Sequence, residues 1–310
     1  MNHLKSIISI CCFCGICFQT VGQQPLWNGK GRIAISSDGN EHDDDDWSAT
    51  AFSLAMLYAA GLQDKVSLYT YSDHIWGSNQ CYPLKSGMSA YDQMKESALV
   101  GGALFNFKRT RFICAVDNAE VAYTAMRDEI NLSTETNPLI VIAAGPMQVI
   151  GEALNRADKE HLKYISVLSH SQWNNHHADQ CHALRTDPTR RQEWDVHSGW
   201  TWDEMKNAFQ QYGTKFILIK DQNGKDEQSG LYCKQEQLNW VKTSPARNNK
   251  YYKAGSWDWL YSRLEVCIKG KAKDCFDFSD AGMIIYLLTG KEDGNADDVR
   301  KIMENPVSQR

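Results

Sequence analysis

The sequence has no excess of positive charge. Its 310 residues include 33 Lys and Arg against 38 Asp and Glu, so the formal net charge is −5 at pH 7. Affinity for nucleic acid depends largely on Lys and Arg side chains that neutralise phosphates. The composition therefore predicts no nucleic-acid partner, whereas it leaves a sugar or nucleoside ligand open.

Common catalytic and cofactor-binding motifs are also missing. The chain contains no GxSxG, HExxH, Walker or GxGxxG pattern, and no CxxC pair beyond residue 22. His176, His177, Cys181 and His182 could suggest zinc, but no second half of a zinc signature accompanies them. The sequence therefore gives little support to a zinc site.

The N-terminal apolar run, residues 7–18, is too short for a membrane span, which needs about 20 residues. It follows Lys5 and precedes small residues, an order typical of a secretory signal. We predict a signal peptide over 1–22, a single domain over 23–310, a secreted or periplasmic location and no integral membrane span. A lipid anchor at Cys17 is less favoured, because the residues before it form a poor lipobox.

Of the ten cysteines, six lie beyond the predicted signal peptide: Cys81, Cys114, Cys181, Cys233, Cys267 and Cys275. An even number of cysteines in an exported chain predicts disulfides. Cys267 and Cys275 are close enough in sequence to close a small loop, so we expect a disulfide there. The connectivity as a whole stays open.

Short β-branched apolar runs alternate with helical patterns along the chain. The expected strands are 32–36, 66–71, 112–116, 139–145, 164–169 and 215–220, and the expected helices are 48–60, 119–129, 147–157, 202–211, 280–289 and 296–305. Such alternation implies right-handed βαβ crossovers. It predicts an α/β fold with a mostly parallel central sheet and helices on both faces. The polar region 221–256 lacks periodicity and predicts an elaborated loop.

Polar side chains follow several of the expected strands. Asp38 and an aspartate run follow the first strand, residues 145–148 the fourth, residues 169–182 the fifth and residues 221–224 the sixth. Ligands of parallel α/β sheets bind beyond the carboxyl ends of the strands. The pattern therefore predicts a site rich in oxygen and amide ligands at this edge.

The aspartate run, Asp43 to Asp46, is the densest of these polar stretches. Clustered carboxylates repel one another unless a cation or ligand offsets them. An EF-hand loop from Asp38 is excluded, because its sixth position is Asp43 rather than Gly and its twelfth is Ala49 rather than Glu. Carboxylates that open a helix also complement its dipole, so one or two of the four can serve only that purpose.

Three segments resemble the inosine-uridine-preferring nucleoside hydrolase superfamily. A strand, Asp38-x-Asn40 and an aspartate pair that opens an Ala-rich helix are similar to its N-terminal DxDPGxDD signature. Residues 139–154 resemble its strand-GPLTN-helix segment, and residues 278–290 its C-terminal metal-binding segment. The resemblance implies a divergent, secreted member with a nucleoside hydrolase-like, Rossmann-like three-layer architecture.

The resemblance also implies a calcium site. The implied metal ligands are Asp38, Asp45, Asp46, Asp280 and the backbone carbonyl of Gln148. The aspartate pair could be Asp44 with Asp45, or Asp45 with Asp46. In the family, calcium holds ribose hydroxyls and orients a water that an aspartate activates, here Asp38 first. The expected substrate-binding residues are Asn40, Asn174, Asn175, His176 and Asn223.

Two departures from the family bear on catalysis. Asn40 stands where the family has an aspartate that binds metal and takes a proton, and an amide cannot be a general base. Ser279 stands where nucleoside hydrolases usually have a histidine implicated in leaving-group handling. Both departures favour a protein that binds without cleaving.

The sequence therefore predicts a calcium-dependent hydrolase of an N- or O-glycosidic bond, acting on a small glycoside or oligosaccharide. The alternative is a non-catalytic carbohydrate- or nucleoside-binding protein on the same fold. A metal-dependent phosphoesterase would want strand-end histidines and a basic group for phosphate, neither of which can be placed. The oligomeric state stays open, a homo-oligomer included.

Overall fold

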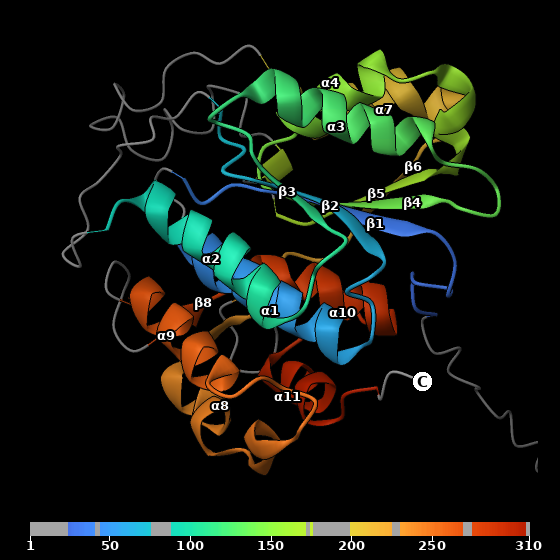
Figure 1. Cartoon of the computed structure of the whole chain (residues 1–310). Helices are drawn as coiled ribbons and strands as arrows, with labels where there is room; N and C mark the ends of the chain where they lie inside the picture. Colours follow the sequence, from blue (N-terminus) through green and yellow to red (C-terminus); the bar gives the residue numbers. More distant parts are fainter. Residues whose placement is uncertain are drawn as a thin grey trace, which may run out of the picture.

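A six-stranded parallel sheet forms the centre of the protein (Figure 1). The structure, a computed structural model, describes residues 24–40, 44–75, 88–171, 174–175, 199–224, 230–268 and 275–307. The strand order is β3-β2-β1-β4-β5-β6. These strands are β1 (Arg32–Ser37), β2 (Val66–Tyr71), β3 (Arg111–Cys114), β4 (Leu139–Ala144), β5 (Ile165–Ser169) and β6 (Lys215–Leu218). All six expected strands are confirmed.

Helices cover both faces of the sheet (Figure 1). On one face lie α3 (Ala119–Asn131), α4 (Gln148–Arg156) and α7 (Trp202–Phe209). On the other lie α1 (Asp45–Ala59), α2 (Ala90–Leu104), α9 (Ser256–Ile268), α10 (Gly282–Thr289) and α11 (Ala296–Glu304). The predicted α/β class, with a parallel sheet between two helical layers, is confirmed. Among the described residues, no helix is both long and apolar enough to cross a membrane.

The sheet is buried on both faces, and its strands show why. In β1, Ile33 and Ile35 pack into the core with α1 and α2, whereas Ala34 packs into the core with α3 and α4. In β4, Ile140 packs into the core with α1 and α2, and Val141 packs into the core with α3 and α4. Successive side chains of a strand point to opposite faces, so a strand buried on both sides is a continuous apolar run.

Two of the longer helices in the described part of the chain, α2 and α9, were not predicted from the sequence. In α2, a Cβ on Gly101 would lie 3.0 Å from Leu54 and from Trp259, and a Cβ on Gly102 would lie 2.6 Å from Phe112. Glycine lowers helix propensity but allows this close packing, so tertiary contact outweighs local preference. The region expected to be a loop holds short elements instead: β7 (Tyr232–Lys234), α8 (Trp240–Thr243) and 3₁₀ turns at Gln235–Leu238 and Pro245–Asn248.

The expected disulfide between Cys267 and Cys275 is wrong. Among the described cysteines, Cys114, Cys233, Cys267 and Cys275 are free thiols. The Cys267 thiol is buried and donates to the backbone oxygen of Asp44, at 2.9 Å. Cys275 lies on β8 (Cys275–Asp277), opposite Lys234 of β7. Cys81, Cys181 and the predicted signal peptide, residues 1–22, lie outside the described residues.

Candidate functional site

Three carboxylates meet beyond the carboxyl end of β1. Asp38 directly follows that strand, Asp46 lies in the first turn of α1, and Asp280 belongs to the 3₁₀ turn η6 (Ser279–Ala281). Each offers one oxygen, and these oxygens lie within 4.8 Å of one another. The residues are 1%, 2% and 9% exposed, respectively. Oxygen ligands of calcium lie at about 2.3–2.6 Å from the ion, so this spacing suits one cation held between them.

The residues that directly follow β1 place Asp38 beside Asp46. Gly39 has a φ of +85°, and a Cβ there would lie 2.9 Å from the Asp46 Cβ. The indole N–H of Trp47 donates to the Gly39 carbonyl at 2.6 Å, and the Ser37 hydroxyl donates to Asp46 Oδ1 at 3.3 Å. Glycine is needed here for both the backbone conformation and the close approach.

Asp45 lies beside this carboxylate cluster, which we define as Asp38, Asp46 and Asp280. Its Oδ2 accepts a hydrogen bond from the Ser279 hydroxyl at 3.4 Å. The sequence left open whether the metal-binding pair is Asp44 with Asp45 or Asp45 with Asp46. The geometry favours the second pair, because Asp46 belongs to the cluster. Direct binding of a metal by Asp45 stays a prediction.

Asp280 is held by two donors that follow β5. The imidazole Nε2 of His170 hydrogen-bonds Asp280 Oδ1, and the Asn174 amide donates to the same oxygen at 3.0 Å. Burial lowers the pKa of His170, but the carboxylates of Asp280 and Asp221 outweigh it, and the pKa is raised to about 9. Both hydrogen bonds go to Oδ1, so they fix the orientation of the Asp280 carboxylate. Neither of them uses Oδ2.

The cluster concentrates negative charge in a buried place. Burial raises the pKa of Asp38 to about 7; a hydrogen bond with Asp46 opposes this, and the charge of Asp280 adds to it. A carboxyl group whose ionised form is destabilised in this way gains from a nearby cation. The electrostatics therefore match a cation site.

Asp73 is a carboxylate of this edge that the sequence analysis missed. It follows β2, the neighbour of β1, and is completely buried. Burial and the charge of Asp38 raise the pKa of Asp73 well above its usual value. The rule used for the other strands, that residues after a strand face the ligand, would have found Asp73 if applied to the second strand.

Asn40 has a structural role. Its amide donates to the His74 carbonyl at 3.1 Å, and its Oδ1 accepts from the His74 backbone N–H at 3.2 Å. Asn40 is completely buried. The side chain thus joins the loop after β1 to the loop after β2, and uses both ends of its amide to do so.

We expect Asn40→Asp to destabilise the protein and to leave calcium binding no stronger. An aspartate would place a carboxylate oxygen against the His74 carbonyl, and an unsatisfied buried group costs about 3 kcal/mol. Urea unfolding would measure the loss, with the exposed Asn155→Asp as the control. A stable Asn40→Asp variant that binds calcium more tightly would contradict the structural role.

The other predicted residues are placed as follows. The Asn175 side chain accepts from the Ser169 hydroxyl at 2.9 Å. The Gln148 side chain accepts from the Trp200 backbone N–H at 2.8 Å, while binding by its backbone carbonyl stays a prediction. Asn223 donates to Asp221 at 3.1 Å. His176 lies outside the described residues. The hydrogen bonds of these side chains therefore give no direct link to the carboxylate cluster, whereas Asn174 touches it.

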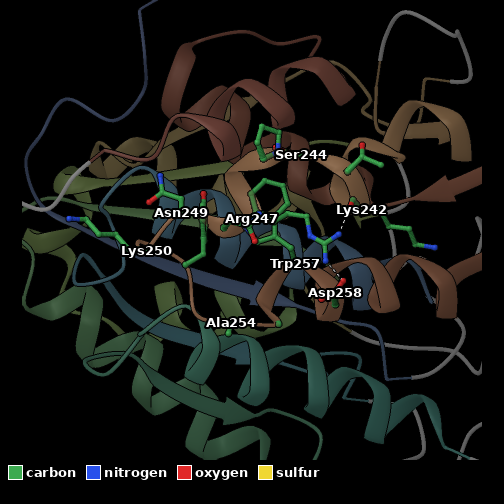
Figure 2. Close-up of a pocket in the computed structure, with 13 residues that line it drawn as sticks. Lys242, Ser244, Arg247, Asn249, Lys250, Ala254, Trp257 and Asp258 are labelled. Atoms are coloured by element: carbon green, nitrogen blue, oxygen red, sulfur yellow. Dashed lines mark hydrogen bonds and ion pairs between the residues drawn. The ribbon is translucent and has the colours of Figure 1, made fainter.

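A separate cavity of about 540 Å³ lies between α8 and the start of α9 (Figure 2). Arg247 crosses it, forms an ion pair with Asp258 and donates to the Lys242 carbonyl. Trp257 also lines the cavity, but the tryptophan is only 2% exposed and offers little ring surface to a sugar. No member of the carboxylate cluster lines this cavity.

Comparisons with known proteins find distant similarities. No known family model matches the chain. The uncharacterized protein P22 of Formosa agariphila is 28% identical over 293 residues, which are 90% of this chain and 93% of that protein. Among solved structures, a plant nucleoside hydrolase superposes with a TM-score of 0.45 and 10% identity, over 83% of this chain and 78% of that chain.

Proposed function

We propose that the protein is an exported, calcium-dependent hydrolase of a glycosidic bond in a small glycoside, nucleoside or oligosaccharide. The observation that carries the proposal is the buried cluster of Asp38, Asp46 and Asp280 at the carboxyl edge of the parallel sheet. Ligands of such sheets bind at this edge. The resemblance of three sequence segments to nucleoside hydrolases supplies the class of reaction.

The donor set fits calcium better than zinc. All three members of the cluster are carboxylates, and the hard cations calcium and magnesium prefer oxygen ligands. The raised pKa of Asp38 means that the cluster is electrostatically unfavourable by itself, so a bound cation would relieve it. The Gln148 carbonyl is a further candidate ligand, whereas Asp45 bonds to Ser279 beside the cluster. Bound calcium would hold a sugar diol and lower the pKa of a bound water.

The protein's own groups would then do three things. Asp38 would accept the proton of the attacking water, because it lies in the cluster at which that water would be held. His170 and Asn174 would keep Asp280 oriented from behind. Burial of the cluster would limit access of bulk water and strengthen each charge interaction.

A binding protein without catalysis is the second candidate. Asn40 favours it, because the residue that resembles a family aspartate is an amide whose two ends bond to the His74 backbone. Such a protein would bind calcium and sugar in the same place but would not cleave a glycoside. Turnover, rather than binding, separates the two candidates.

The first test is calorimetric titration of calcium into the chain from residue 23 onward, with and without D-ribose. We expect calcium to bind, and ribose to strengthen that binding. Nitrophenyl glycosides and nucleosides would then be screened, with hydrolysis expected to stop in EDTA and to return with calcium. Absence of calcium binding, or hydrolysis that resists EDTA, would overturn the proposal. Binding without any turnover would favour the second candidate.

A further inference from the structure

The two carboxylate oxygens of Asp73 differ in their contacts. Asp73 Oδ2 accepts a hydrogen bond from the Ser36 hydroxyl at 2.6 Å. Asp73 Oδ1 has no hydrogen-bond partner among the described residues, although the side chain is completely buried. Nearly all buried polar atoms in proteins are hydrogen-bonded, so an exception calls for an explanation such as a ligand or ion.

The unpartnered oxygen faces the carboxylate cluster. A Cβ placed on Gly145, which follows β4, would lie 2.7 Å from Asp73 Oδ1 and 3.0 Å from Asp38 Cγ. The two carboxyl groups therefore border the same small space above Gly145. Only a glycine at this position keeps that space open, because any other residue would fill it with its Cβ.

Several contacts hold Asp73 in this orientation. Its backbone N–H donates to the Ser37 carbonyl at 3.1 Å, beside the hydrogen bond from Ser36. The next residue, His74, is tied to Asn40 by two hydrogen bonds. The position of Oδ1 is thus set by the protein before any ligand arrives, which is what a binding group requires.

We propose that Asp73 Oδ1 accepts a hydrogen bond from an O–H group of the molecule bound at the carboxylate cluster. That group is either a water or a sugar hydroxyl. The proposal rests on the proposed function, since it assumes that a cation and a glycoside occupy the cluster. Asn40, by contrast, is bonded at both ends of its amide to the His74 backbone.

The test compares Asp73→Ala and Asp73→Asn with the wild type. Calcium affinity is measured first by calorimetry and should fall by less than about tenfold, because Asp73 lies outside the set of three clustered oxygens. Ribose is then titrated into the calcium-loaded protein. If Asp73 holds a sugar hydroxyl, the ribose affinity should fall by roughly tenfold or more. If it holds a water, the ribose affinity should stay and kcat should fall with KM unchanged.

Ser36→Ala is the matched control. It removes the support of Oδ2 but leaves Oδ1 in place, so its effects on ribose affinity and kcat should be smaller than those of Asp73→Ala. Wild-type behaviour of both Asp73 variants, or an equal effect of Ser36→Ala, would overturn the role of Asp73 alone. A wild-type chain that binds no calcium would overturn the proposed function and this inference together.

Discussion

Asp46→Ala should lower the affinity for calcium on the order of 100-fold, whereas Asp45→Ala should change it less than tenfold, because each carboxylate that binds calcium directly contributes strongly to affinity. Asp46 belongs to the carboxylate cluster, while Asp45 bonds to Ser279 beside it. Asp280→Ala should behave like Asp46→Ala. The measurement is calorimetric titration of calcium at constant pH and ionic strength.

The exposed Asp64→Ala is the control for loss of one negative charge. Asp46→Ala should not unfold the calcium-free protein, since it removes a charge from a crowded group of carboxylates. Asp280→Ala should leave it folded but less stable, because it also removes the partner of the buried His170 and Asn174 side chains. Circular dichroism would verify this. Loss of binding in Asp45→Ala with retention in Asp46→Ala would show that calcium uses the other register of the aspartate run.

Without calcium, the free energy of unfolding should fall as the pH rises from about 4 to about 7, because the pKa of Asp38 is about 7 in the folded chain against an ordinary value of 3.8. Between these values the folded state binds more protons than the unfolded state, so the slope is negative. One proton contributes about 1.4 kcal/mol per pH unit. Asp73, whose pKa is also raised, contributes a negative slope as well. His170, with a pKa raised to about 9, continues the negative slope above pH 6.5. Asp221, with a pKa lowered to about 2, gives a positive slope of stability against pH, but only below about pH 4.

Calcium should offset this loss, because a cation bound to the ionised cluster stabilises the folded state by about 2.7 kcal/mol at 100 times its Kd. Urea unfolding from pH 4.5 to 7 would measure both effects, in EDTA and in calcium. Asp38→Asn should reduce the slope in EDTA, with the remainder coming from Asp73. A slope that persists unchanged in this variant would assign the effect to another group.

Much of the site and fold could be predicted because the sequence records burial directly. The four inner strands, β1, β2, β4 and β5, are largely buried on both faces, so each is rich in apolar residues and its end can be located to within a residue or two. Asp38 was found by this rule, because it directly follows β1. Asp280 was found through resemblance to a family, and its hydrogen bonds to His170 and Asn174 came only with the structure.

Other features depend on contacts between distant segments. Asp45 and Asp46 are neighbours on a helix, where successive side chains point about 100° apart, so the position of α1 selects which one faces Asp38. Cys267 and Cys275 are close in sequence, yet Cys267 is buried against the start of α1. Such contacts cannot be predicted from the composition of the chain or from the spacing of its residues.

The sequence by itself determined the strand order along the chain, the class of the fold and the edge at which polar residues gather, because local burial and chain direction decide these. Only the tertiary structure decided that Asn40 braces two loops and that Asp73 faces the cluster. Both results depend on β1, β2 and β4 lying side by side. That adjacency brings together residues more than 30 positions apart, through packing that no single segment encodes.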